Sequence, residues 1–214
     1  MTSVWSVVIP QKDLRVAKSR MELGCAERRQ VVVAMLEDTV AAVSETGSVE
    51  RIIVVCDTTH DVAEFSHLGV ITHLNRMGKG LNVAVEAGAA LAREVQPRCN
   101  LVVLPGDLPG LQPIDLSRAL DLALRNPRSF VTDASGSGTT LLAATAGHEL
   151  RAAYGESSSA LHALSGAMEI VSGSQLGSLR HDVDDLADLR TAVADGRGPR
   201  TRQAYAELRG IPMP

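Results

Sequence analysis

The sequence predicts a single three-layer α/β domain, in which a mixed, mostly parallel sheet lies between two layers of helices. Between residues 5 and 126, four short apolar runs are interspersed with three longer helical segments, as in successive βαβ units. Runs such as residues 101–104 are apolar throughout, which is typical of strands buried on both faces. The length of 214 residues and the hydrophobic content of 45% suit one domain with a sizeable core.

The first 126 residues are expected to hold four strands and three helices. Pro113 suits the first turn of a helix, and Gly47 ends the first long helix. The strands are the apolar runs 5–10, 51–56, 70–74 and 101–104, and the helices are the segments 27–46, 81–94 and 113–126.

The regular alternation ends after residue 126. A helix is expected after Asp185, and the tail from Gly196 is expected to be loosely ordered, with one short helix at 202–209. No repeat or linker divides the chain, so residues 1–214 form one domain, with a core at about 5–195 and a C-terminal tail at 196–214. The remaining expected elements are strands at 129–132, 141–145 and 168–171, a small-residue loop at 133–140 and a short helix that begins within 152–163.

The composition excludes several classes of protein. Aromatic residues make up 2% of the chain and the net charge is −4, which argues against a nucleic-acid partner. The three cysteines are far apart and form neither a zinc motif nor a disulfide framework, which favours a reducing cytoplasm. No signal peptide or apolar run of membrane-spanning length is present, so a cytoplasmic protein without a membrane partner is expected.

The stretch LVVLPGDLPGL at residues 101–111 places one carboxylate just beyond a central strand. Gly106 allows a sharp turn, and the prolines on either side stop the strand. Ligands of open α/β sheets bind at the carboxyl ends of strands, where a carboxylate is a natural ligand for Mg²⁺. Asp107 is therefore a candidate metal ligand, and a turn residue that caps the next helix explains it equally well.

Two loops carry groups suited to a phosphorylated ligand. Loop 11–24 holds four cations within nine residues, which suits a polyphosphate, although charged runs are more often solvated. Loop 75–82 has two glycines before a helix N-terminus, where backbone amides are open to a ligand. Asn82 offers a two-sided amide to a base or ribose, but a plain helix cap is the simpler explanation. The four cations are Lys12, Arg15, Lys18 and Arg20.

Two later stretches complete the set of candidates. Residues 154–159, YGESSS, either cradle a small anion or form an ordinary loop. Residues 182–185, DVDD, either complement a helix dipole or share divalent metals with Asp107. These pieces together suit phosphoryl or nucleotidyl transfer with Mg²⁺. The sequence has no GxSxG or HExxH motif, and its six histidines form no metal-spaced cluster.

Several of these segments together resemble one known family. VVIPQKDLRVAKSRM at 7–21 resembles the opening of the guanylyltransferase family of deazaflavin coenzyme F420 biosynthesis. LVVLPGDLPGL resembles its central metal motif, and GKGLNVAV at 78–85 resembles its nucleotide loop. YGESSSALH at 154–162 and HDVDDLADL at 181–189 match two further segments, so the likeness covers nearly the whole chain.

The resemblance implies a GT-A-like, Rossmann-like nucleotidyltransferase fold. Family members join GTP to a small phosphorylated acid and release pyrophosphate, and the product then passes to a separate deazaflavin transferase. The acid is expected to be phosphoenolpyruvate, with 2-phospho-L-lactate as the alternative. By motif match, the catalytic residues would be Lys18 and Asp107, and Mg²⁺ would be held by Asp107, Asp182 and Asp184. The nucleotide would contact Lys12, Lys18, Arg20, Gly80 and Asn82, and the acid would contact Thr139, Gly155 and Ser158.

Two departures from the family pattern bear on these expectations. Ser157-Ser158-Ser159 stands where archaeal relatives have Asn-Ser-Phe, and the missing aromatic residue favours phosphoenolpyruvate as the acid. Asp185-Leu186 stands where members often have Thr-Pro, and Asp185 is expected to cap the following helix. Rival functions are a nucleotidyltransferase that uses CTP or another acceptor, and a binding domain that has lost the chemistry.

Overall fold

The computed structural model describes residues 4–171 and 173–210, and it contains one α/β domain built around a seven-stranded sheet. The strand order is β3-β2-β1-β4-β6-β5-β7. Neighbouring pairs are parallel except where β6 runs antiparallel to β4 and to β5. The mixed, mostly parallel sheet expected from the sequence is therefore confirmed. The strands are β1 (Trp5–Gln11), β2 (Val49–Cys56), β3 (Ile71–Leu74), β4 (Asn100–Val103), β5 (Arg128–Thr132), β6 (Thr139–Ala144) and β7 (Met168–Glu169).

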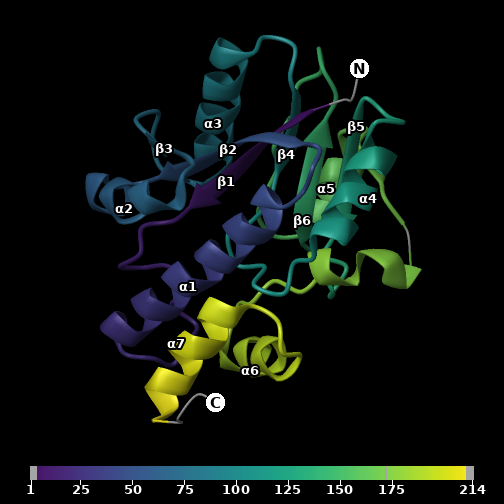
Figure 1. Ribbon diagram of the computed structural model, residues 1–214. Helices are drawn as coiled ribbons and strands as arrows, with labels where there is room; N and C mark the ends of the chain where they lie inside the picture. Colours follow the sequence, from purple (N-terminus) through teal and green to yellow (C-terminus); the bar gives the residue numbers. More distant parts are fainter. Residues whose placement is uncertain (1–3, 172, 211–214) are drawn as a thin grey trace.

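Helices cover both faces of the sheet (Figure 1), with α1 (Cys25–Ser44) and α4 (Pro113–Ala123) on one face. The other face is covered by α3 (Leu81–Val95) and α5 (Ser158–Leu164). Alternate strand residues enter the two cores, so Val7 packs with the α1 side and Val8 with the α3 side. Gly88 lets α3 approach the sheet closely, because a Cβ atom there would lie 2.4 Å from Val8 Cγ1.

One short helix was missing from the sequence-based expectation. The polar segment after β2 contains a short helix, α2 (Thr59–Glu64), whose first turn is capped by the Thr58 hydroxyl. The short helix expected to begin within 152–163 is present and begins at Ser158. Gly155 and Ser157 adopt positive φ angles of 143° and 55°, which keep the preceding loop out of the helix. Short 3₁₀ turns span Ser66–Leu68 and Gly173–Leu179, and α6 (Leu186–Ala194) follows Asp185 as expected.

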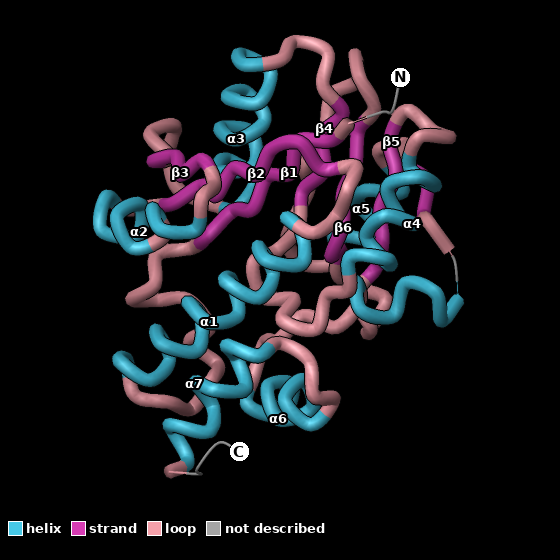
Figure 2. The backbone as a smooth tube through the Cα atoms, in the orientation of Figure 1, coloured by secondary structure: helices cyan, strands magenta, loops and turns pink. Residues whose placement is uncertain are grey.

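The sequence predicted a loosely ordered tail with one short helix at 202–209. That helix is present, and it begins three residues earlier than expected, at Pro199. Helix α7 (Pro199–Arg209) packs against α1 on the side away from the strands, as the tube in Figure 2 shows. Its N-terminus is held by the buried carboxylate of Asp38, which accepts bonds from Arg200 N at 3.1 Å, Thr201 N at 2.8 Å and Thr201 Oγ1 at 2.7 Å. A carboxylate here satisfies donors that open the helix and complements its dipole. Residues 211–214 of the expected tail lie outside the described chain.

No helix within residues 4–171 and 173–210 combines the length and the apolar character needed to cross a bilayer.

Replacing Asp38 with alanine is expected to lower the free energy of unfolding by about 2–3 kcal/mol, because the variant leaves the buried donors of α7 without an acceptor. Chemical denaturation of the two proteins measures the difference. Asp121→Ala on the exposed side of α4 is the matched control and should change stability by less than about 0.5 kcal/mol. Equal stability of Asp38→Ala and the wild type would show that α7 is not anchored through this carboxylate.

Candidate active site

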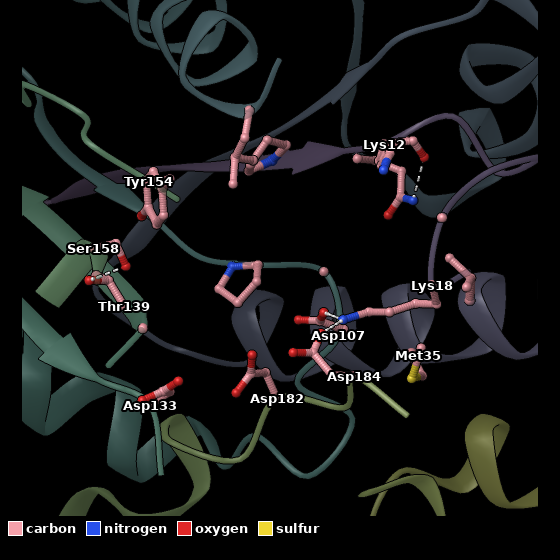
Figure 3. Close-up of a pocket in the computed structure, with 18 of the residues that line it drawn as sticks. Lys12, Lys18, Met35, Asp107, Asp133, Thr139, Tyr154, Ser158, Asp182 and Asp184 are labelled. Carbon is pink, nitrogen blue, oxygen red and sulfur yellow. Dashed lines mark hydrogen bonds and ion pairs between the residues drawn. The ribbon is translucent and has the colours of Figure 1, made fainter. Parts of the chain in front are cut away.

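A cavity of about 700 Å³ opens at the carboxyl ends of β1 and β4, where the sheet predicts a ligand site. Its two ends differ in chemistry (Figure 3). At one end Lys18 points toward Asp107 and Asp184, and at the other end lie the hydroxyl groups of Thr139 and Ser158. Nine of the eleven residues proposed from the sequence line this cavity: Lys12, Lys18, Arg20, Asp107, Thr139, Gly155, Ser158, Asp182 and Asp184.

Lys18 is the centre of an ion cluster between distant parts of the chain. Its ammonium group contacts Asp107 Oδ2 and lies 2.6 Å from Asp184 Oδ1. Burial acts to lower the pKa of Lys18, but the two carboxylates outweigh it and hold that pKa above its usual value. Lys18 also adopts a left-handed φ of 51°, a conformation that costs a non-glycine residue roughly 1–3 kcal/mol and is frequent at functional sites.

Backbone hydrogen bonds bring the acidic segment 182–184 to the loop after β4. Val183 N donates to Asp107 O at 3.1 Å, and the buried Val183 side chain anchors this contact in the core. Asp182 and Asp184 flank Val183 and therefore both reach the cavity. On the other side of the loop, Leu108 N donates to Thr39 Oγ1 of α1 at 3.1 Å. The Asp107 turn is thus fixed from two sides.

The three carboxylates form a group that fits a divalent cation. One oxygen from each of Asp107, Asp182 and Asp184 lies within 4.8 Å of the others. Asp107 Oδ1 is buried and has no hydrogen-bond partner among the described residues, so its lone pairs are available to a cation. Burial, and then repulsion from Asp107 and Asp184, raises the pKa of Asp182 to about 7. Hard oxygen ligands in this number suit Mg²⁺.

As predicted from the sequence, Asp185 caps the following helix and lies outside the carboxylate group. Its side chain caps α6 by accepting bonds from Ala187 N at 2.7 Å and Asp188 N at 3.0 Å.

The loop after β1 places two further cations at the rim of the cavity. The side chains of Lys12 and Arg20 are exposed, and neither forms an ion pair with another residue in the described part of the chain. Arg15 instead turns to Asp13, with its Nη2 atom 2.6 Å from Oδ2. Three of the four cations noted in the sequence therefore face the cavity.

Gly80 and Asn82, from the loop that opens α3, do not line the cavity in the described structure, although Leu81 between them does. The Asn82 amide is used on both sides, since Nδ2 donates to Tyr154 O at 3.0 Å and Oδ1 accepts from Tyr154 N at 2.8 Å. Asn82 therefore holds the loop that carries Tyr154 and Gly155 against the cavity.

The hydroxyl end of the cavity is supported from behind by a histidine that the sequence analysis left aside. His162 of α5 is fully buried, and its Nδ1 atom lies 2.9 Å from Thr139 Oγ1. Ser158 Oγ donates to the same Thr139 oxygen at 3.1 Å. The motif YGESSSALH includes Tyr154, which lines the cavity, and His162, so that stretch was the available signal for both. Asp133 also lines this end and carried no motif.

The sheet topology defines the chain as an α/β protein with a nucleotidyltransferase-type fold, and its group of three carboxylates could hold a cation. A crystal structure of 4-diphosphocytidyl-2C-methyl-D-erythritol synthase has the same fold, with a TM-score of 0.60 and 20% identity over 89% of this chain and 97% of that one. The structure of Rv0371c from Mycobacterium tuberculosis, in complex with manganese, matches with a TM-score of 0.54 and 20% identity over 89% of this chain and 98% of that one.

The family follows from the sequence match. The model of the family described as "Guanylyl transferase CofC like" matches residues 5–211, and the chain belongs to that family. Phosphoenolpyruvate guanylyltransferase from Thermomonospora curvata is 44% identical over 206 residues, covering 95% of this chain and 90% of the relative. The enzyme of the same name from Streptomyces scabiei is 41% identical, covering 95% of this chain and 97% of the relative.

The buried histidine predicts a pH dependence of stability. Burial, with a smaller contribution from Arg128, lowers the pKa of His162 from 6.5 to about 4. Between pH 6.5 and about 4, His162 is therefore protonated in the unfolded chain and neutral in the folded one. The stabilisation from His162 is present above pH 6.5 and is lost as the pH falls toward 4. Denaturation of the wild type and His162→Gln between pH 7.5 and 4 should show a stability difference that shrinks as the pH falls.

His67→Gln is the control for this measurement, because hydrogen bonding to Glu37 raises the pKa of the exposed His67 ring. Its stabilising contribution is present at low pH and is lost as the pH rises, so the difference from the wild type should change in the opposite direction. A difference between wild type and His162→Gln that is constant over this range would contradict a buried, neutral His162.

Proposed function

We propose that the protein transfers a guanylyl group from GTP to phosphoenolpyruvate, giving enolpyruvoyl-diphospho-5'-guanosine and pyrophosphate for coenzyme F420 biosynthesis. The observation that carries the proposal is one cavity with a lysine–carboxylate cluster at one end and the hydroxyl groups of Thr139 and Ser158 at the other. Membership of the guanylyltransferase family supports the reaction class. The name of the relatives in Thermomonospora and Streptomyces supports phosphoenolpyruvate as the acid.

In this proposal the triphosphate of GTP lies at the cationic end. Lys12 and Arg20 approach it from the rim, and Lys18 lies deeper beside the carboxylates. Charge-assisted hydrogen bonds from three cations offset much of the phosphate charge. Gly80 and Asn82 are the residues proposed for the guanosine side, where Asn82 acts by holding the Tyr154 loop, since its amide is already bonded to that backbone.

The acid is proposed to lie at the opposite end, against Thr139, Gly155 and Ser158. Thr139 and Ser158 are buried polar side chains that border the cavity. Ser158 donates its hydroxyl proton to Thr139 Oγ1, so Thr139 is the hydroxyl donor available to an anionic oxygen, the partner that such donors prefer. Gly155 has a φ of 143°, which leaves its backbone open toward the cavity. This end carries no lysine or arginine among its described lining residues, and it does carry the Asp133 carboxylate, so we propose that neutral donors bind the acid.

The chemistry needs charge compensation and alignment more than proton transfer. A phosphate monoester has a second pKa of about 6 and is largely ionised near neutral pH, so its oxygen attacks without a general base. The new bond forms at the α-phosphorus of GTP, the bond to the bridging oxygen of the β-phosphate breaks, and pyrophosphate leaves. Lys18 would offset the charge that develops there, and the two ends of the cavity would hold the anions in line.

Asp107, Asp182 and Asp184 are the residues proposed to hold Mg²⁺. A bound Mg²⁺ supplies neutralisation of phosphate charge and a template that orients attacking and leaving oxygens. The lysine ammonium already placed between Asp107 and Asp184 supports a preference of this group for cations.

The rival functions are less well supported. The relatives described above carry the name of the phosphoenolpyruvate enzyme, so 2-phospho-L-lactate is not favoured. The family match argues against CTP, and the intact lysine–carboxylate cluster argues against a domain that only binds. We further propose that the product passes to a separate deazaflavin transferase and that the enzyme is cytoplasmic, which the three unpaired cysteines support.

The direct test is pyrophosphate release by the purified protein with Mg²⁺ and GTP, with phosphoenolpyruvate, 2-phospho-L-lactate or no acid. Release is expected with phosphoenolpyruvate and near background in the other two reactions. CTP in place of GTP is the control for the nucleotide and should support little release. Preferential release with 2-phospho-L-lactate, or with neither acid, would overturn the proposed substrate.

Asp107→Asn is expected to lower turnover by about 10²–10³-fold, because it removes one charge from the cation site and one partner of Lys18. The fold should persist, since Lys18 keeps Asp184 and the backbone bonds of the loop remain. Turnover and thermal unfolding are measured together, with the exposed Asp121→Asn as control. A folded Asp107→Asn protein with near-normal turnover would remove Asp107 from the mechanism.

A further inference from the structure

His162 lies directly behind the hydroxyl end of the cavity and has no part in the chemistry described above. Its ring is fully buried, with the Tyr154 ring edge-on at a centroid distance of 5.2 Å and the Phe130 ring tilted at 6.1 Å. Both ring nitrogens are hydrogen-bonded, to Thr139 Oγ1 at 2.9 Å and to Ala153 N at 3.0 Å. A buried polar group that satisfies two different segments is suited to fixing their geometry.

The two bonds determine the tautomer of the ring. A backbone N–H can only donate, so Nε2 must accept the bond from Ala153 and carries no proton. In the neutral ring the proton is therefore on Nδ1, which donates to Thr139 Oγ1. Burial keeps the ring neutral near pH 7, since it lowers the pKa of His162 to about 4.

The tautomer in turn determines the orientation of the Thr139 hydroxyl group. A hydroxyl oxygen has two acceptor positions and one proton to donate. On Thr139 Oγ1 both acceptor positions are used, by Nδ1–H of His162 and by the hydroxyl of Ser158. No acceptor for the Thr139 proton lies among the described residues, and Thr139 borders the cavity. The proton therefore points into the cavity.

We propose that His162 is a positioning residue that fixes Thr139 as a hydrogen-bond donor to an anionic oxygen of the acid substrate. The inference rests on the proposed function, because it takes the ligand at this end to be the phosphorylated acid. Through its bond to Ala153, the same ring also holds the loop that carries Tyr154 and Gly155. A donor oriented before binding favours an anion without the cost of rearranging the site.

Two substitutions separate the two bonds of the ring. In His162→Asn the side-chain amide occupies the Nδ1 position and keeps a donor toward Thr139, whereas in His162→Gln it occupies the Nε2 position and keeps an acceptor for Ala153. Each variant thus preserves one half of the network. His162→Gln is expected to raise the KM for phosphoenolpyruvate about three- to ten-fold, with the KM for GTP changed less than two-fold. His162→Asn keeps the donor toward Thr139 and should raise the KM for the acid clearly less than His162→Gln does, although it also loses stability because Ala153 N loses its acceptor.

A third variant tests whether His162 acts through Thr139. Thr139→Val removes the donor itself, so His162→Gln should have no further effect on the KM for the acid in that background. A merely structural role predicts that His162→Gln and His162→Asn alter both KM values and kcat together, in proportion to lost stability. That result, or an unchanged KM for the acid in a folded His162→Gln protein, would overturn the inference.

The tautomer itself is measurable without catalysis. ¹⁵N NMR of the imidazole nitrogens in the wild-type protein should show a protonated Nδ1 and an unprotonated Nε2 for His162, and the opposite tautomer would overturn the inference even if the variants failed to fold. The wild-type assay separates this inference from the proposed function. Release of pyrophosphate with neither acid overturns the function, whereas an active wild type with an unaffected His162→Gln variant overturns the role of His162 alone.

Discussion

The ion cluster of Lys18 with Asp107 and Asp184 is the interaction on which the rest of the site depends. Three carboxylates within 4.8 Å of one another repel, and that repulsion helps to raise the pKa of Asp182 to about 7. The ammonium group of Lys18 offsets part of this repulsion, and the backbone of Lys18 adopts a left-handed conformation. The fold therefore maintains a concentration of negative charge that is suited to a bound cation and to an anionic substrate beside it.

Helix α1 connects this cluster to the periphery of the protein. Two adjacent residues of α1 do so, because Asp38 caps the C-terminal helix and Thr39 accepts the bond from Leu108 in the loop that carries Asp107. Gly198, at the start of that helix, sits so close to the loop that a Cβ atom would lie 2.9 Å from Pro109 O. The start of the C-terminal helix thus packs directly against the loop that carries Asp107.

The prediction from sequence succeeded where local pattern decides structure. The apolar runs became buried strands, and Asp185 became a helix cap, because strand burial and capping depend on neighbours in the chain. It missed the short helix α2 and the first turn of α7, which begins before the expected 202–209. At the start of α7 a side chain distant in sequence holds the backbone, since Asp38 accepts bonds from residues 200 and 201. Asn82 holds the loop before α5 in the same way.

The sequence by itself determined the order of the strands and of the helices other than α2, the family motifs and nine of the residues that line the cavity. Only the tertiary structure decided how those residues are used. It turned Arg15 toward Asp13, bonded the Asn82 amide to the Tyr154 backbone, and placed His162 behind Thr139. The physical reason is that the direction of a side chain and the partner of each donor are set by contacts between segments far apart in the chain, which a linear motif does not encode.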